Sequence, residues 1–129
     1  GEALHISPGE DVVVEIRVRD PQAPNFGGRN PQVSRIDLIS GSVLGPVVDR
    51  TADRNATTRV VRRFTDSDWH RDGEYLVMRH RLKDVRTPLY LRVRGTNTQE
   101  LEPAVDVSAE DPWSDLWFYG NPTFIEFER

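Results

Sequence analysis

Apolar and polar residues alternate along much of the chain with a period of two, the pattern of a strand that buries one face. The clearest run places Val12, Val14, Ile16 and Val18 on one face and mostly charged residues on the other. We predict further strands at 34–39, 59–64, 75–82, 89–94, 116–119 and 123–127, with a short first strand at 4–6. In the run 59–64, Val60 and Val61 are adjacent, so the pattern leaves the inward face undecided.

Turn-forming residues separate these runs, for example Ser7-Pro8-Gly9, Asp72-Gly73 and Asn121-Pro122. No segment has the periodicity of an amphipathic helix, although 65–69 is compatible with one helical turn. We therefore predict an all-β antiparallel sandwich of about seven or eight strands. It is immunoglobulin-like or jelly-roll-like, with little helix, and residues 1–129 form one domain. Two long connections, 20–32 and the acidic 95–112, are the places to look for a function or a partner.

Composition narrows the function classes. The 129 residues are 36% hydrophobic and 29% charged, which suits a thin two-layer fold. The net charge of -4 gives no basic excess for nucleic acid, and no apolar run is long enough to cross a membrane. Without cysteine there is no disulfide, thiolate metal site or thiol nucleophile. The chain begins abruptly, nearly within a strand, so we expect it to be one domain of a longer bacterial protein, either cytoplasmic or exported.

Candidate catalytic and metal-binding residues are sparse. His5, His70 and His80 have no second ligand at metal-like spacing, and His80 shares an apolar face, so we expect it at the edge of the core. The segment 66–73 resembles a calcium loop, but its acidic residues are wrongly spaced and it lacks the closing glutamate, so we interpret it as a turn. We predict no catalytic, cofactor or metal residue in this chain.

Outward-facing arginines are the more interesting charge pattern. If the strand assignments hold, a set of arginines points away from the core, and adjacent strands would turn it into a carboxylate- or phosphate-binding face. The favoured alternative is that these arginines pair with Glu15, Asp37, Glu74 and Asp84 on solvated sheet faces. The set comprises Arg17, Arg19, Arg79, Arg81, Arg92 and Arg94.

Aromatic residues concentrate near the end of the chain. They are open to two interpretations: a stacking platform for carbohydrate, or a buried or interface role, which we favour because alternation puts either Trp117 and Tyr119 or Leu116 and Phe118 toward the core. The platform would use Trp69, Tyr90, Trp113, Trp117 and Tyr119.

Two segments carry a family resemblance. Residues 88–97, PLYLRVRGTN, followed by 111–122, DPWSDLWFYGNP, resemble the C-terminal region of actinobacterial PHP-type metal-dependent phosphoesterases, and 33–42 is similar to theirs too. The resemblance covers the last third of the chain well and the rest loosely. It implies that an upstream barrel of the same chain binds divalent metals and hydrolyses phosphate esters, and that no catalytic residue lies here.

We therefore expect a non-catalytic C-terminal accessory domain that serves docking on the upstream catalytic domain, stability or substrate access. The alternatives are a carbohydrate-binding module and an immunoglobulin-like domain for a protein partner. The docking or ligand face that the resemblance suggests comprises Arg92, Arg94, Asn97, Trp113, Asp115, Trp117 and Tyr119.

Overall fold

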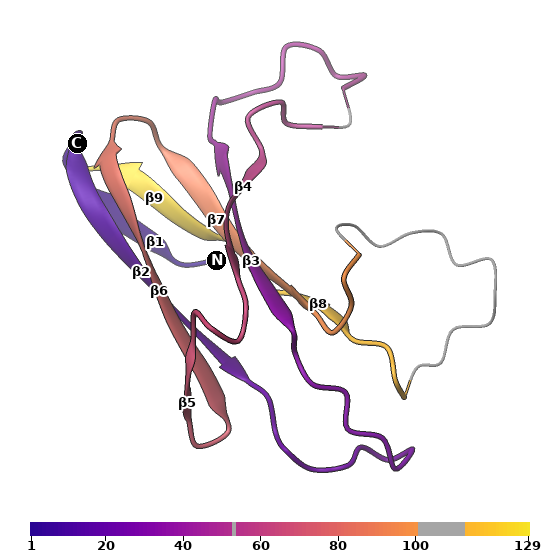
Figure 1. Ribbon diagram of the computed structural model, residues 1–129. Helices are drawn as coiled ribbons and strands as arrows, with labels where there is room; N and C mark the ends of the chain where they lie inside the picture. The colour runs from indigo at the N-terminus through magenta and orange to yellow at the C-terminus, as the bar shows by residue number, and fades with distance from the viewer. Residues whose placement is uncertain (53, 101–112) are drawn as a thin grey trace.

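Nine β-strands in two sheets make up the regular structure of the part of the chain that the structure describes, residues 1–52, 54–100 and 113–129. The structure is a computed structural model, and its two sheets lie face to face as the layers of a sandwich (Figure 1). The predicted all-β sandwich is confirmed, with one or two more strands than expected. Within the described residues there is no helix that could span a membrane.

The smaller sheet is built on the long alternating strand that the sequence pattern picked out. Strand β2 (Glu10–Arg19) pairs antiparallel with β6 (Tyr75–Val85), and β6 pairs with the short β5 (His70–Asp72). The order is β2-β6-β5, so β2 has a neighbour on one side only. The inward side chains of β2 include Val12 and Ile16, which are 7% and 5% exposed.

The larger sheet has the order β1-β9-β7-β3-β4, with β8 also pairing β7. Strands β8 and β9 take successive stretches of β7, β8 opposite residues 94–96 and β9 opposite residues 89–91, and Asn121-Pro122 separates the two. The first strand pairs with β9 in parallel. The strands are β1 (Ala3–Ile6), β3 (Arg35–Ser42), β4 (Arg59–Phe64), β7 (Leu89–Thr96), β8 (Trp117–Tyr119) and β9 (Thr123–Phe127).

The core lies between the sheets and is aliphatic, with one large aromatic at its centre. Ile36, Leu38 and Phe64 from the larger sheet are at most 1% exposed, and Leu76 and Met78 of β6 pack against them. Apart from Phe64, each comes from the inward set of an alternating strand, as the period of two requires. Completing the core cluster are Ile6, Val12, Ile16, Val33, Val85, Leu91 and Ile125.

A bulge resolves the inward face of β4. The register shifts between Leu38 and Ile39, which pair with Arg62 and Val60, so Val61 is the extra residue. Val61 and Phe64 both pack against the core, three positions apart, which a regular strand would not allow. The stretch 65–69 forms a turn closed by the hydrogen bond from Asp68 N to Thr65 O (2.9 Å), not a helical turn.

The strand order is that of an immunoglobulin-type sandwich. In chain order, β2, β3, β6, β7 and β9 occupy the places of strands B, C, E, F and G, and β5 occupies that of D. The difference lies at the start of the chain. In the constant-type arrangement strand A flanks strand B, whereas here β1 pairs with β9 in the opposite sheet, and the place beside β2 is not taken by any described strand.

Candidate functional site: an open groove beside an edge strand

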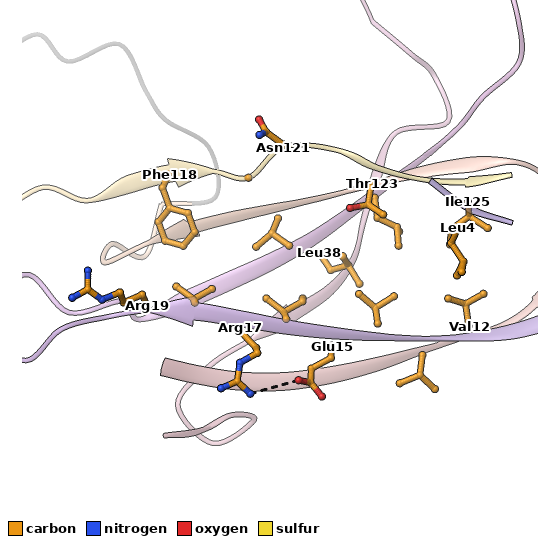
Figure 2. A pocket seen from close by; sticks show the side chains of 17 residues that line it. Leu4, Val12, Glu15, Arg17, Arg19, Leu38, Phe118, Asn121, Thr123 and Ile125 are labelled. Carbon is orange, nitrogen blue, oxygen red and sulfur yellow. Dashed lines mark ion pairs between the residues drawn. The ribbon is translucent and has the colours of Figure 1, made fainter. Parts of the chain in front are cut away.

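The sandwich is open between β2 and the β8–β9 side of the larger sheet. A groove of about 650 Å³ lies there, with β2 as one wall and β7, β8 and β9 as the other. Figure 2 shows Phe118 and Leu38 from the larger sheet and Val12 from β2 projecting into this space, whereas Glu15 and Arg17 point away from it. The residues that line the groove are Leu4, 12–19, Leu38, Leu91, Val93, Phe118, Gly120, Asn121, Thr123 and Ile125.

The groove is apolar inside and polar at its rim. Val14 and Val18, the two inward valines of β2 that face it, are only half-buried, and Leu4 is 47% exposed. At the rim, Thr123 is exposed beside the groove, as are the charged residues on the outer side of β2. Apolar side chains that stay partly wet inside a hollow are a surface that gains free energy when a partner covers them.

The main chain of β2 adds directional chemistry to this surface. Asp20 N donates to Glu74 O (2.7 Å), which fixes the phase of the ladder between β2 and β6. In an antiparallel strand, every second residue forms its main-chain hydrogen bonds with the same neighbouring strand. Val18 and Ile16, like Asp20, therefore bond to β6, whereas Arg17 and Arg19 direct their N–H and C=O groups to the open side. The groove therefore combines an apolar floor with a row of main-chain donors and acceptors.

The residues predicted as a docking or ligand face lie elsewhere, mostly along β7 and β8 on the outer face of the larger sheet. Arg94 and Tyr119 are register partners, as are Thr96 and Trp117. The Arg92 side chain lies over the Tyr119 ring (5.8 Å) and its Nε donates to Gly120 O (3.0 Å). Asp115, two residues before β8, is exposed. Most of this predicted face is thus gathered on one side of the molecule, but it is not the groove.

Asn97 anchors the segment that leads into β8. Its side-chain Nδ2 donates to Ser114 O (2.6 Å), and its Oδ1 accepts from Leu116 N (3.0 Å). Nearby, Asn25 Nδ2 donates to Trp113 O (2.8 Å) and the Phe26 ring contacts the Trp113 ring at 6.0 Å. The long connection 20–32 therefore meets Trp113, which follows the acidic connection 95–112 in the sequence; residues 101–112 of that connection lie outside the described residues.

A buried carboxylate organises the arginines on this outer face. Asp37 on β3 is 1% exposed, and its direct register partners are Arg63 on β4 and Arg94 on β7. Arg94 donates through Nε and Nη2 to Asp37 Oδ2 at 3.0 and 2.7 Å. Arg63 Nη1 reaches both carboxylate oxygens at 3.2 and 3.1 Å. Arg35 Nε makes an ion pair at 3.2 Å without hydrogen-bond geometry, while its other nitrogens bind the carbonyls of Gln99 and Glu100.

The remaining outward arginines confirm the pairing interpretation for the smaller sheet. Arg17 and Arg19 pair with Asp72 and Glu74 (3.2 and 2.9 Å), Arg79 with Glu15 (2.8 Å), and Arg81 with Asp11 (2.6 Å). The expected partner Asp84 instead pairs with Arg86. The six predicted arginines do not form one cationic face, because four lie on one sheet and two on the other.

Hydrogen bonding favours the ionised form of two carboxylates on the smaller sheet, Asp11 and Glu15. The pKa of Asp11 is lowered first by the hydrogen bond from Asp84 N and then by Arg81. The pKa of Glu15 is lowered mainly by its hydrogen bond from Arg79. Both groups are exposed, so these pairs orient side chains on the surface more than they stabilise the fold.

The candidate stacking aromatics occupy separate environments. Trp69 packs partly buried against the core, and Trp113 packs against Phe26 in the loop region. Tyr90 lies over Gly41 on the neighbouring strand and contacts the Thr58 hydroxyl through its own. Phe118 packs against the core, so alternation leaves Trp117 and Tyr119 on the outer face.

A second hollow, of about 1030 Å³, opens on the other side of the sandwich between the ends of β3, β4 and β6. Its lining is more polar and includes Arg81 and Arg86, both ion-paired, together with His80. Burial, and secondarily the charge of Arg62, lowers the pKa of His80, in agreement with its expected place at the edge of the core. Among the described residues no group of three histidine or acidic side chains is arranged to hold a metal.

Comparisons with known proteins give no relative from which a role can be read. No protein-family model matches the chain, and no curated protein or solved structure matches it either. The interpretation of the groove therefore rests on its own geometry. The alternation in residues 12–18 predicted the strand that forms one wall of the groove. Nothing in the sequence indicated that this strand would lack a second neighbour.

Proposed function

We propose that this chain is a non-catalytic accessory domain of a longer protein, and that it acts by docking against another part of that protein. The observation that carries the proposal is the groove beside β2, whose apolar floor remains partly exposed in the chain by itself. The ion-paired surfaces support it, since many charged groups of the described residues pair with one another, including Arg81 and Arg86 at the second hollow.

Chemical labelling of the groove tests this docking. The chain has no cysteine, so Thr123→Cys places a single thiol beside the groove at an exposed position. We expect a maleimide to label this thiol much more slowly in the complete gene product than in the 129-residue chain. Val48→Cys is the matched control, because Val48 is 99% exposed and is not among the residues that line the groove. Equal labelling rates of the Thr123→Cys thiol in the two proteins would contradict docking at this surface.

The parent enzyme is a separate part of the proposal. The resemblance of residues 88–97 and 111–122 implies a metal-dependent phosphoesterase upstream, and this stays a prediction. Its test is hydrolysis of a phosphate monoester or diester by the complete gene product with Mn²⁺ or Zn²⁺, using the 129-residue chain as the control. Turnover by the isolated chain would contradict the non-catalytic role, whereas no turnover by the complete protein would remove the phosphoesterase parent but leave the docking domain.

A further inference from the structure

The edge of β2 differs from every other sheet edge among the described strands. At the remaining edges, β1 has four residues, β5 and β8 have three each, and β4 has six, of which three are arginines. Short length and charge are the usual means by which proteins keep sheet edges from pairing. The open stretch of β6 beyond β5 is also interrupted near its end by Asp84, whose φ is 51°.

Strand β2, by contrast, has ten residues. Its outward side chains Glu15, Arg17 and Arg19 are charged, so what distinguishes this edge is its length and its inward side. Its inward residues from Val12 to Val18 are all valine or isoleucine, and its one irregularity lies at the start, between Glu10 and Val12. Beside it lies the apolar groove. Main-chain donors and acceptors at strand spacing next to an apolar trough match one kind of ligand, an extended polypeptide with apolar side chains at alternate positions.

The position of the first residues indicates the side from which such a strand comes. Phe124 N donates to Glu2 O (2.7 Å), and Gly1 abuts Pro122 so closely that an ideal Cβ on Gly1 would collide with the Pro122 carbonyl oxygen. Asn121 and Thr123, the neighbours of Pro122, both line the groove. Gly1 therefore lies against the stretch 121–123 that borders the groove. In Figure 2, Asn121 and Thr123 lie between the end with Leu4 and Val12 and the end with Phe118 and Arg19.

Direction follows from the turn between β1 and β2. The chain reverses through Ser7-Pro8-Gly9, so the two strands run in opposite directions in opposite sheets (Figure 1). Polypeptide that continues the line of β1 backward from Gly1 would run antiparallel to β2, alongside its second half. This is the place that strand A holds in the constant-type immunoglobulin sandwich.

We infer that the groove binds one extended polypeptide strand that runs antiparallel to β2 and leads into β1 at Gly1, completing the smaller sheet as its fourth strand. The inference rests on the proposed function, since it identifies the docked element as the segment of the longer protein joined to Gly1. About six extended residues would run the length of the second half of β2 at about 3.3 Å per residue. Their alternate side chains would cover Val14, Val18 and Phe118.

Amide hydrogen exchange of the complete gene product, compared with the 129-residue chain, tests this inference. Arg17 and Arg19 direct their amides to the open side, and strand pairing slows exchange of such amides by about tenfold or more. Val13 also faces the open side but lies toward the Leu4 end, so its amide should change little and serves as the internal reference. Unchanged exchange at Arg17 and Arg19 would overturn the inference.

A matched pair of variants separates strand pairing from general coverage. Arg17→Pro and Arg17→Thr both remove the ion pairs of Arg17, but only proline removes the donor on the open side, and the ladder to β6 does not use that donor. Protection of Arg19 in the complete gene product should be lost with Arg17→Pro and kept with Arg17→Thr. Protection that survives Arg17→Pro would overturn the inference. Thermal unfolding of both 129-residue variants checks that the domain itself stays folded.

The same measurement distinguishes other occupants and the failure of the proposed function. A Thr-Val repeat of about six residues joined ahead of Gly1 should protect Arg17 and Arg19, and a Gly-Ser segment of equal length should not. Protection by the free Thr-Val peptide, but not by the joined one, would identify a separate chain as the occupant of the groove. Protection of the 129-residue chain that rises with its own concentration would identify a second copy as the occupant. Either result overturns the inference. If the thiol of Thr123→Cys is shielded in the complete protein while these amides stay unprotected, docking holds and strand addition fails.

Discussion

The buried carboxylate of Asp37 provides the sharpest test of how the larger sheet is held together. Asp37→Ala removes a carboxylate that Arg35, Arg63 and Arg94 share, and two of these arginine side chains are themselves only 9% and 5% exposed. Arg94 makes two hydrogen bonds to it, each worth about 1.5–3 kcal/mol for a charged group. Arg63 adds little, because its side chain is 37% exposed. Removing one partner of a buried ion pair costs about 3–5 kcal/mol, in agreement with that sum.

Urea unfolding followed by tryptophan fluorescence measures the loss. With a denaturant slope of about 2 kcal/mol per molar, a loss of about 4 kcal/mol lowers the unfolding midpoint by about 2 M at unchanged slope. Asp37→Asn, which keeps the shape and removes the charge, should fall between wild type and alanine. The control is Asp11→Ala, which also loses two hydrogen bonds from one arginine, but at the surface, and should shift the midpoint far less. A loss below about 1 kcal/mol for Asp37→Ala would refute the reasoning, because the arginines would then not depend on this carboxylate.

Two further predictions concern pH and packing. Burial holds the pKa of His80 in the folded state below its unfolded value near 6.5, so the unfolded state binds more protons as the pH falls. The free energy of unfolding should therefore decrease as the pH falls from about 7.5 to 5, and His80→Gln should make this decrease smaller. An unchanged pH profile in His80→Gln would contradict this explanation. Gly41→Ala would place a Cβ 2.5 Å from the Tyr90 ring and should lower the free energy of unfolding, measured by heat or urea, by about 1–3 kcal/mol. Gly120→Ala is the control, because its Cβ would lie 3.7 Å from the nearest atom and should cost little. Equal losses of stability in the two variants would show that Tyr90 moves aside freely.

Local patterning was sufficient to predict most of the strands. Alternation located β2, β3, β6, β7 and β9 because each buries one face, and the period of two is a direct record of that burial. It failed for β5, since His70, Arg71 and Asp72 are all exposed and have no apolar side to reveal. It was ambiguous for β4 because the bulge at Val61 breaks the period.

Pairing between strands was harder to predict than the strands themselves. Asp37 was expected to pair with the outward arginines on a solvated face, but it is 1% exposed. Its burial depends on β3 lying between β4 and β7, and no residue spacing encodes that adjacency. Most residues of the predicted docking face lie on one side of the molecule, in part because the Asn97 side chain joins the end of β7 to the main chain of Ser114 and Leu116. The groove was not predicted, because it results from the pairing of β1 with β9 and not with β2.

The pairing of β1 with β9 also explains why the groove lies beside β2. The larger sheet is tied across β3, β4 and β7 by the Asp37 network and extends through β9 to β1, whereas the smaller sheet stops at β2. Two packed sheets bury their inner faces fully only over the area that they share. The apolar side chains that the larger sheet carries beyond β2, Phe118 and Val93 among them, therefore remain only partly covered. A fourth strand beside β2 would widen the smaller sheet over this uncovered area and satisfy the open edge in the same step.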